Sequence, residues 1–400
     1  MSNPSRGGQQ LSSTEPYSDG DAVTVLDELL RRAMAAAASD IHLEPKREYV
    51  QVRFRIDGTM VEQRSIDYAQ AVQVVQRIKV LSRMDIAERR VPQDGQFSLQ
   101  TQGQTMHLRA STFPSSQGEK VVMRLLRGHN LMAYSKLGLD PDDMRKVRDV
   151  VLRPQGFVIT CGPTGSGKTS TLYALLQLID TARVNVVTLE DPIEVELMSI
   201  TQGQTHARSG FTFAAGLRAI LRQDPDVILV GEMRDAETSA IALQAALTGH
   251  LVLSTLHTSD TVETVVRLVD LGVEPWIIAN ALSAVIAQRL VRVVCPSCKA
   301  PAKLKEDLWD GDEVLLPAGS DIVRPTGCDA CHRTGYKGRT GIFEVLELDD
   351  DLRELVKAKA TAQAYRAVLR QRRIKTLRRS GFSRVMAGIT TVDEVLRVTT

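Results

Sequence analysis

The sequence contains no run of about 18 apolar residues, the length that a membrane-spanning helix requires. Aromatic residues make up only 4% of the chain, and the formal net charge is +2, from 50 basic and 48 acidic residues. These values argue against an aromatic stacking platform and against a general attraction to nucleic acid or anionic lipid. Residues 1–20 lack the apolar stretch of a secretion signal, so we expect a disordered tail on a protein that stays in the cytosol.

The length and composition are those of a globular protein with two or three domains: 400 residues, 43% apolar and 24% charged. Residues 21–128 mix helical patterns with alternating strands, which predicts a small α+β domain. From residue 144 onward, apolar strand-like runs alternate with helical patterns, which predicts an α/β domain with a mostly parallel sheet. Between the two, His129 to Met144 is expected to be a linker that leads into a helix.

A glycine-rich segment between a buried-strand pattern and a helical pattern fits G-x-x-x-x-G-K-[ST], the loop that holds nucleotide phosphates. Glycines let the backbone approach an anion closely, and the start of the following helix favours negative charge there. We expect Lys168 to reach the β- and γ-phosphates of ATP and the Thr169 hydroxyl to bind Mg²⁺. The predicted nucleotide-binding residues are Gly162, Pro163, Thr164, Gly165, Ser166, Gly167, Lys168, Thr169 and Ser170.

Acidic residues and histidines border predicted strands further along the chain. Glu190 and Glu194 follow an apolar run, where they either order a water or a magnesium contact or form a polar turn. Glu232 ends a second apolar run, and beside the P-loop its carboxylate is suited to activating water. His257 follows a third run, as a γ-phosphate sensor would, and a structural histidine is an equal alternative. His250 precedes that run, which is more typical of a structural residue.

Two arginines of the N-terminal domain, Arg109 and Arg124, lie fifteen residues apart on separate predicted strands. From the residues alone, a pair of solvated strand arginines is the favoured interpretation. Two other local predictions can be checked directly: Val91 to Gln96 should form a loop, and Pro275 to Arg292 should be helical. Residues 366–379 carry seven basic side chains, which favours a solvated helix face over a docking surface for an acidic protein or lipid headgroups.

Four of the five cysteines form two C-x₂-C pairs, Cys295/Cys298 and Cys328/Cys331, with 29 residues between the pairs. In a reducing compartment this pattern favours metal over disulfide, and two such pairs can close a tetrahedral Zn²⁺ site. Since sulfur would fill all four ligand positions, we expect structural rather than catalytic zinc, with free or redox thiols as the alternative. The gap is longer than usual, so the insert LWDGDEVLLPAGSD (308–321) is expected to loop out, and Cys161 is expected to be simply buried.

Ten motifs, in this order, resemble the secretion ATPase superfamily of type II secretion and type IV pilus assembly motors. The resemblance covers about residues 36–400, which is far more specific than a P-loop alone. The motifs are ASDIHLEP (38–45), RFRIDG (53–58), VPQDGQ (91–96), LRASTFPSSQGEKVVMRLL (108–126), GPTGSGKTSTLY (162–173), LEDPIE (189–194), QDPDVILVGEMRD (223–235), TGHLVLSTLHTSD (248–260), QRLVRVVCPSC (288–298) and GRTGIFEVLELDD (338–350).

The resemblance implies a fold for each part of the chain. Residues 21–128 look like the PAS-like domain of the family, followed by a linker over 129–143 and a RecA-like P-loop ATPase core over 144–292. A small tetracysteine zinc subdomain over 293–345 and a C-terminal helical region over 346–400 complete the chain.

The resemblance also implies roles for single residues. Arg109 and Arg124 match the arginines that reach the nucleotide phosphates, which replaces the solvated interpretation given above. Two guanidinium groups can neutralise charge on the transferred phosphoryl group when the domains close. The remaining matches are Glu190 and Glu194 with the aspartate box, Glu232 with the Walker B glutamate, and His250 and His257 with the histidine box.

The family works as a homo-hexameric ring on the cytoplasmic face of the inner membrane and drives pilin or pseudopilin assembly through a polytopic platform protein. We therefore expect ATP, Mg²⁺ and Zn²⁺ as ligands, membrane association through protein partners, and no direct nucleic-acid binding. Many members carry a further N-terminal domain, for which only about 20 residues are present here. Retraction motors lack the cysteine pairs, so the four cysteines favour an assembly or export motor. A nucleic-acid translocase and a nucleotide-gated scaffold without turnover are the alternatives.

Overall fold

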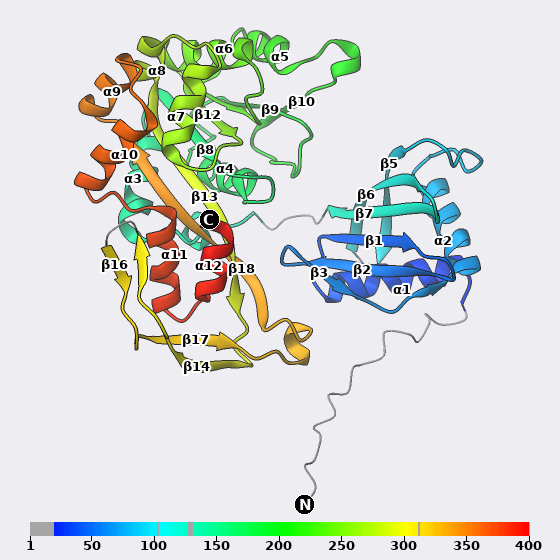
Figure 1. Ribbon diagram of the computed structural model, residues 1–400. Coiled ribbons are helices and arrows are strands. Elements are labelled where there is room, and N and C mark those ends of the chain that lie inside the picture. The colour runs from blue at the N-terminus through cyan, green and yellow to red at the C-terminus, as the bar shows by residue number, and fades with distance from the viewer. Residues whose placement is uncertain (1–19, 102–103, 127–130, 311–312, 400) are drawn as a thin grey trace, which may run out of the picture. The chain divides into compact units, whose positions relative to one another are not determined.

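The computed structural model describes residues 20–101, 104–126, 131–310 and 313–399. The expected tail over residues 1–20 therefore lies, except for Gly20, outside the described residues. The chain forms two compact units, Met1–His129 and Asn130–Thr400 (Figure 1). Every helix among the described residues is too short or too polar to span a membrane. The expected mixed α/β fold is confirmed.

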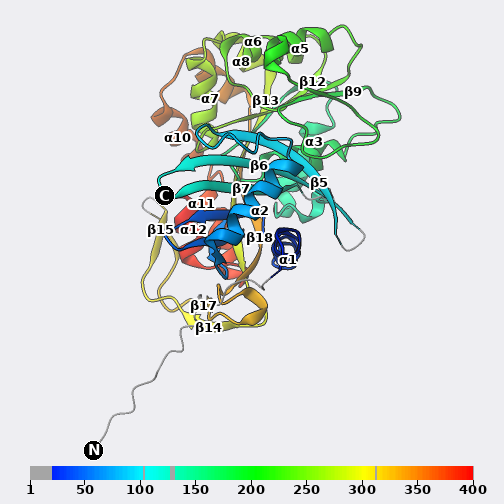
Figure 2. The same ribbon diagram turned by 90° about the vertical axis from the view of Figure 1, so that its right-hand side faces the viewer.

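The N-terminal unit is an antiparallel sheet with two helices packed against it (Figures 1 and 2). The strand order is β3-β2-β1-β7-β6-β5, and β4 pairs with β2. Alternation along β2 turns Val50, Val52 and Phe54 into the core, as a strand with one buried face requires. The elements are α1 (Ala22–Ala35), β1 (Asp40–Pro45), β2 (Tyr49–Ile56), β3 (Thr59–Glu62), β4 (Ile66–Asp67), α2 (Tyr68–Leu81), β5 (Gln93–Thr101), β6 (Gln104–Ser115) and β7 (Gly118–Leu126).

The predicted loop over Val91 to Gln96 is wrong in its second half, because β5 already begins at Gln93. Its backbone pairs with β6 from the register Gln93 opposite Thr112 onward. The amide side chain of Gln93 also accepts a hydrogen bond from the backbone of Asp85, which fixes the start of the strand. Glycine and proline near this position pointed to a turn, but the cross-strand pairing decides the conformation.

The C-terminal unit is built on a mostly parallel sheet in the order β10-β9-β11-β12-β8-β13-β18, in which only β18 runs antiparallel to its neighbour. Buried apolar residues of the sheet form two core clusters. The elements up to the sheet centre are η1 (Tyr134–Lys136), α3 (Pro141–Val151), β8 (Gly156–Cys161), α4 (Lys168–Leu176), β9 (Val186–Glu190), β10 (Thr201–Gln204), η2 (Ala207–Ser209), α5 (Phe213–Ile220), β11 (Val227–Val230), α6 (Ala236–Leu247), β12 (Leu251–Leu256), α7 (Thr261–Asp270) and α8 (Pro275–Ala281).

The predicted helix over Pro275 to Arg292 is wrong beyond Ala281, where α8 ends and the long strand β13 (Leu282–Val294) begins. This strand lies between β8 and β18, and its first seven residues are all buried. A continuous apolar run is compatible with a buried helix or a buried strand, so periodicity could not decide between them. Pairing with β8 and β18 satisfies the backbone of β13 and decides in favour of the strand.

The insert over residues 308–321, which was expected to loop out, forms an antiparallel strand pair, and the strands on either side of this pair are themselves paired antiparallel. Four short helices follow the last strand of the main sheet and pack in part against β13 and β18. The elements are β14 (Lys299–Lys303), β15 (Leu308–Asp310), β16 (Glu313–Leu316), β17 (Asp321–Pro325), η3 (Asp329–Cys331), β18 (Tyr336–Glu347), α9 (Asp350–Lys357), α10 (Ala362–Gln371), α11 (Leu377–Met386) and α12 (Val392–Thr399).

Candidate functional site

Four neighbouring parallel strands of the C-terminal unit bring the predicted residues to one edge of the sheet. The P-loop follows β8, Glu190 ends β9, Glu232 follows β11 and His257 follows β12. Because β9, β11, β12 and β8 are adjacent and parallel, their carboxyl ends meet at the same edge. Ligands bind at this edge in open α/β sheets. The fold therefore assembles these residues from segments far apart in sequence.

The P-loop has a backbone shape that only glycine adopts readily. Gly162, Gly165 and Gly167 have φ angles of 150°, 78° and 91°. A Cβ atom on Gly162 would lie 2.6 Å from the carbonyl oxygen of Gln288, and one on Gly167 would lie 2.7 Å from the side-chain Nε2 of the same residue. The loop ends at α4, whose first N–H groups have no partner within the helix and favour an anion. This cradle fits a nucleotide phosphate.

The ammonium group of Lys168 lies against the backbone of the P-loop. Its Nζ donates to the carbonyl oxygens of Gly162 and Pro163 at 2.7 and 3.1 Å. Burial lowers the pKa of Lys168 from its usual value. The buried Ser166 hydroxyl has no hydrogen-bond partner among the described residues. A phosphate entering the loop would offer acceptors to both side chains.

Glu232 belongs to a row of polar side chains in which each contacts the next. Arg234 Nε donates to Glu232 Oε1 at 2.6 Å, and the same guanidinium lies 3.4 Å from Asp191 Oδ2. On the other side, His257 Nε2 lies 3.2 Å from Glu232 Oε2, while His257 Nδ1 lies 3.5 Å from Lys168 Nζ. A neutral imidazole protonated on Nε2 satisfies both contacts. His257 thus links the P-loop lysine to the carboxylate that follows β11.

Glu190 is buried, and its hydrogen-bond partners among the described residues are three uncharged side chains. Its carboxylate accepts hydrogen bonds from the Tyr173 hydroxyl, from the Thr188 hydroxyl at 2.6 Å and from the Gln202 amide at 3.0 Å. Burial, with Glu190 as the second cause, raises the pKa of Tyr173, so the phenol stays a donor. Three neutral donors can hold a carboxylate in one orientation.

A cleft of about 350 Å³ opens among these residues, a size typical of ligand sites. Its walls include Thr169, Ser170 and Glu194 together with Lys168, Glu190 and Glu232. The Thr169 hydroxyl and these carboxylates supply the oxygen ligands that Mg²⁺ prefers, so the donor set fits a magnesium ion bound with a nucleotide.

His250, also predicted to bind the nucleotide, does not line the cleft. It precedes β12 at the opposite end of the strand from His257. Its Nδ1 lies 2.9 Å from the carbonyl oxygen of Ala245, and its own carbonyl accepts from Gly156. Six strand residues separate the two histidines, which is about 20 Å of extended chain.

Arg109 and Arg124 belong to the N-terminal unit, where they lie directly opposite each other on β6 and β7. Both side chains are exposed. Arg124 Nε donates to Asp40 Oδ1 at 2.9 Å, and Arg55 approaches the same carboxylate at 3.7 Å. Like charges directly opposite each other on a sheet repel, so the placement of Arg109 opposite Arg124 does not itself stabilise the N-terminal unit.

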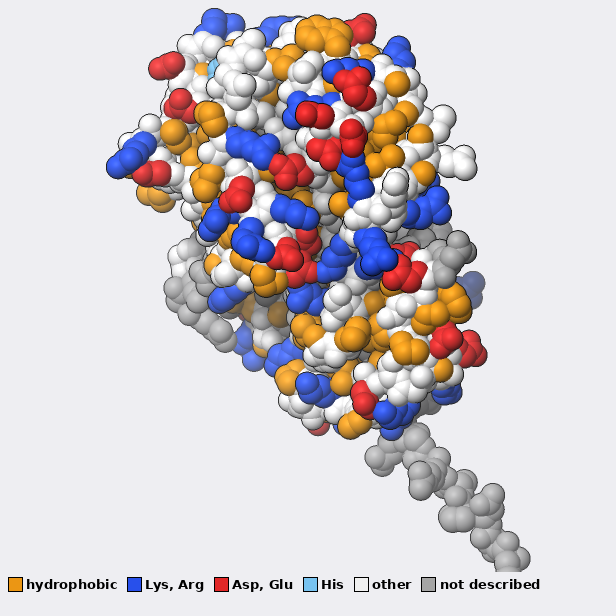
Figure 3. Space-filling view, turned by 90° about the vertical axis from the view of Figure 1, so that its left-hand side faces the viewer, with side chains coloured by type: hydrophobic (Ala, Val, Ile, Leu, Met, Phe, Trp, Pro, Cys, Tyr) orange, Lys and Arg blue, Asp and Glu red, His pale blue; other side chains and the backbone are white. Residues whose placement is uncertain are grey.

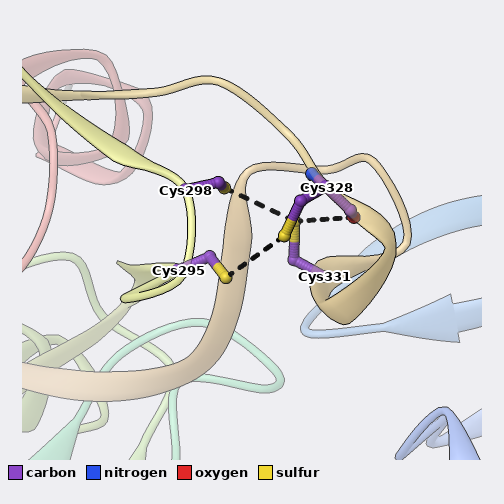
Figure 4. Close-up of side chains that lie close together, drawn as sticks. All are labelled: Cys295, Cys298, Cys328 and Cys331. Carbon is purple, nitrogen blue, oxygen red and sulfur yellow. Dashed lines mark hydrogen bonds between the residues drawn. The ribbon is translucent and has the colours of Figure 1, made fainter.

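The four paired cysteines converge, and all five cysteines are free thiols (Figure 4). The sulfur atoms of the four paired cysteines lie within 4.8 Å of one another, and the Cys298–Cys331 and Cys328–Cys331 sulfur separations are both 3.8 Å. Four sulfurs at 2.3 Å from a central zinc ion would be about 3.8 Å apart, so the geometry fits Zn²⁺. Burial opposes ionisation of Cys331, but N–H groups of Cys328 and Gly335 outweigh it and lower the pKa of this thiol to about 7.

Several residues of the site were not singled out from the sequence. Arg234 and Asp191 stand within the motifs that contain Glu232 and Glu190, and their acidic and basic character was the available signal. Tyr173 follows the P-loop by one helical turn, and Gln288 lies more than a hundred residues away on β13. Gln288 accepts a hydrogen bond from Thr171 of α4, so it supports the P-loop helix from the neighbouring strand.

Comparisons with known proteins agree on one family. The model of the "Type II/IV secretion system protein" family matches residues 16–397. A type II secretion system protein E from Aeromonas hydrophila is 43% identical over 396 residues, 98% of this chain and 79% of that protein. A type IV pilus assembly ATPase from Acinetobacter baylyi is 44% identical over 386 residues, 95% of this chain and 66% of that protein.

The fold has a close counterpart among solved structures. The ATPase DotB of Legionella pneumophila superposes with a TM-score of 0.71 at 22% identity, covering 96% of this chain and 97% of that one. At this identity the likeness concerns the fold alone. The match of the family model over almost the whole length decides the assignment: the chain belongs to the type II/IV secretion system protein family.

Proposed function

We propose that the chain is a Mg²⁺-dependent ATP hydrolase that works as a homo-hexameric ring. It powers the assembly of a type IV pilus or a type II secretion pseudopilus through a polytopic inner-membrane platform protein. The observation that carries the proposal is the cleft in which the P-loop, Glu232, His257 and Glu190 meet at one edge of the parallel sheet. Family membership and the relative that is named a type IV pilus assembly ATPase support the same reaction.

Within this proposal, the residues 144–292 form a RecA-like core and 21–128 a PAS-like domain. ATP phosphates occupy the P-loop and take Lys168 away from the carbonyls of Gly162 and Pro163, since the ammonium group binds an anionic acceptor more strongly than a neutral one. Mg²⁺, bound by Thr169, neutralises charge on the phosphates. Residues 293–345 hold structural Zn²⁺ on four cysteines, and the protein is peripheral to the inner membrane through its partners.

Glu232 accepts a proton from the attacking water, and Glu190 assists it. Hydrogen bonds from Arg234 and His257 hold the Glu232 carboxylate in place to accept a proton from water. Arg109 and Arg124 complete the site when the N-terminal unit closes on a nucleotide, where they neutralise charge on the transferred group. The exposed, mutually repelling pair on β6 and β7 supports this role, because an anion between them would relieve the repulsion.

The test is ATP hydrolysis against oligomeric state for the parent protein and Glu232→Gln. Turnover should rise with ring formation and fall by at least about 100-fold in Glu232→Gln, because the amide cannot accept the proton. The matched control is Glu237→Gln, which removes an exposed carboxylate on α6 outside the cleft and should retain turnover. Full turnover in Glu232→Gln would refute the water-activating role. ATP binding without turnover in the assembled parent ring would favour a scaffold instead.

A further inference from the structure

The basic segment 366–379 is mostly neutralised by the protein itself. Four of its seven basic side chains pair with carboxylates: Arg366 with Asp260, Arg372 with Asp349 and Asp351, Lys375 with Asp140, and Arg379 with Asp310 and Glu313. Arg378 approaches the carbonyl oxygen of Thr399. Arg370 and Arg373 are exposed and form no ion pair with any carboxylate that the structure describes. The charge available to a ligand is therefore concentrated on two neighbouring guanidinium groups.

These two arginines stand at a cavity of about 550 Å³ between α10, the start of α7, the start of α11 and the β15–β16 hairpin. Val262, Leu369 and Ile374 give the cavity an apolar wall. Figure 3 shows the face of the molecule on which α10 lies, with basic and acidic side chains intermixed across it. An apolar wall with a few charged groups at its border, in a cavity of this volume, is typical of small-molecule sites.

The interior carboxylate of the cavity is already satisfied. Glu344 accepts hydrogen bonds from the backbone N–H and hydroxyl of Thr261, at the start of α7, and from the backbone N–H of Leu377, at the start of α11. Burial raises the pKa of Glu344, which weakens its repulsion of an anion. Asp260 and Asp310 are likewise engaged, with Arg366 and Arg379. None of these acids is left to attract a cation.

We propose that this cavity binds a small amphipathic anion, in which a carboxylate or phosphate meets Arg370 and Arg373 and an apolar body packs against Leu369, Ile374 and Val262. Guanidinium groups suit both head groups because their donors match the spacing of the anionic oxygens. The site is separate from the nucleotide cleft, since the two share no lining residue. The inference does not depend on ATP hydrolysis.

The probe is 8-anilinonaphthalene-1-sulfonate, an apolar fluorophore with one anionic group, titrated into the full-length protein without nucleotide. Octanoate and octyl phosphate should displace it, and their relative strengths show which head group the cavity prefers. Octyltrimethylammonium, with the same chain and the opposite charge, should not. The variant Arg370→Gln/Arg373→Gln should bind the probe at least about tenfold more weakly, while Arg370→Lys/Arg373→Lys should retain most of the affinity.

The control Arg145→Gln/Arg267→Gln removes two charges from exposed helical positions outside the cavity and should leave probe affinity unchanged. Lys168→Ala should also leave it unchanged, which excludes binding in the nucleotide cleft. Melting temperatures show that each variant is folded. Equal affinity in Arg370→Gln/Arg373→Gln, or equal displacement by octyltrimethylammonium, would overturn the proposal.

Discussion

The P-loop cleft and the four-cysteine cluster are both candidate ligand sites, but they are held together in different ways. In the cleft, Lys168 is bound to backbone carbonyls, Glu232 to Arg234 and His257, and Glu190 to three neutral donors. These charged groups all have protein partners, whereas the buried Ser166 hydroxyl of the P-loop has none among the described residues. The parallel sheet beneath supplies a large buried core. The protein's own hydrogen bonds and the sheet therefore hold the residues of the cleft in position.

The cysteine cluster has fewer such contacts, among them the backbone N–H groups of Cys328 and Gly335 that donate to Cys331 Sγ. Cys295 lies 4.0 Å from Cys328 and Cys298 lies 3.8 Å from Cys331, so the thiols face mainly one another. The segment that joins the two pairs forms only two-stranded sheets. A two-stranded sheet is marginal in water by itself, and β14 alternates between exposed and half-buried residues. Leu304 and Leu316 are the residues by which this segment reaches the buried core. We therefore expect that loss of the nucleotide abolishes activity at the cleft, whereas loss of the metal ion unfolds the structure around the cysteines.

The largest effect should come from breaking the cluster with Cys298→Ser/Cys328→Ser. Structural zinc contributes roughly 10–16 kcal/mol of binding free energy in small domains, and losing two thiolates removes most of it. Zinc content should fall from about one equivalent per chain to below about 0.1, and amide exchange over residues 299–327 should become fast. Cys161→Ala, which changes the cysteine outside the cluster, should keep the zinc. Less than half an equivalent in the parent protein would contradict the zinc assignment.

The second effect concerns the cleft, where Lys168→Ala should lower ATP turnover by at least about 100-fold, which corresponds to about 2.7 kcal/mol. The melting temperature should hardly change. Burial already lowers the pKa of Lys168, so its charged form is not a source of stability. The control Lys357→Ala removes an exposed lysine on α9 and should keep turnover. A large loss of stability in Lys168→Ala would break the contrast between cleft and cluster.

The contrast itself shows what a sequence can and cannot predict. The P-loop, the strand-end carboxylates and the cysteine pairs were predictable because their spacing carries the chemistry. The strand β13 was not predictable, because the pattern from Leu282 to Val294 is compatible with either a helix or a strand. Pairing with the neighbouring strands decides between the two conformations. The hydrogen-bond partners of Glu190 and Glu232 were not predictable either. Gln202 and Arg234 reach these carboxylates through side-chain contacts that form only when the sheet is folded.

A smaller effect is expected next to the cysteine cluster, where ion pairs rather than a metal ion hold α12 to β13. Buried Glu394 pairs with Arg292 and Arg397. Burial opposes its ionisation, but the hydrogen bonds from Arg397 and Arg292 outweigh it and lower the pKa of Glu394 from 4.5 to about 2. Because the folded-state pKa is depressed, the stabilisation is complete above pH 4.5 and is lost as the pH falls toward 2.

Glu394→Gln should therefore reduce the free energy of unfolding by about 2–3 kcal/mol at pH 7, and the difference from the parent should shrink as the pH falls below about 4. Urea denaturation at several pH values measures both. Glu354→Gln, at an exposed glutamate of α9, is the control and should change stability by less than about 0.5 kcal/mol. A difference that stays constant down to pH 2 would show that packing, not charge, holds α12.

The smallest effect should come from Tyr173→Phe, which removes one of the three donors to Glu190 and leaves Thr188 and Gln202. A buried acceptor that loses one partner of three costs about 1–2 kcal/mol of unfolding free energy. Since two donors still orient the carboxylate, ATP turnover should fall by less than about tenfold. Tyr365→Phe is the matched control, because Tyr365 is also buried but no hydrogen bond of its hydroxyl is seen among the described residues. Equal losses in both variants would mean that Tyr173 acts through packing, and the cleft would then depend on its core rather than on its hydrogen bonds.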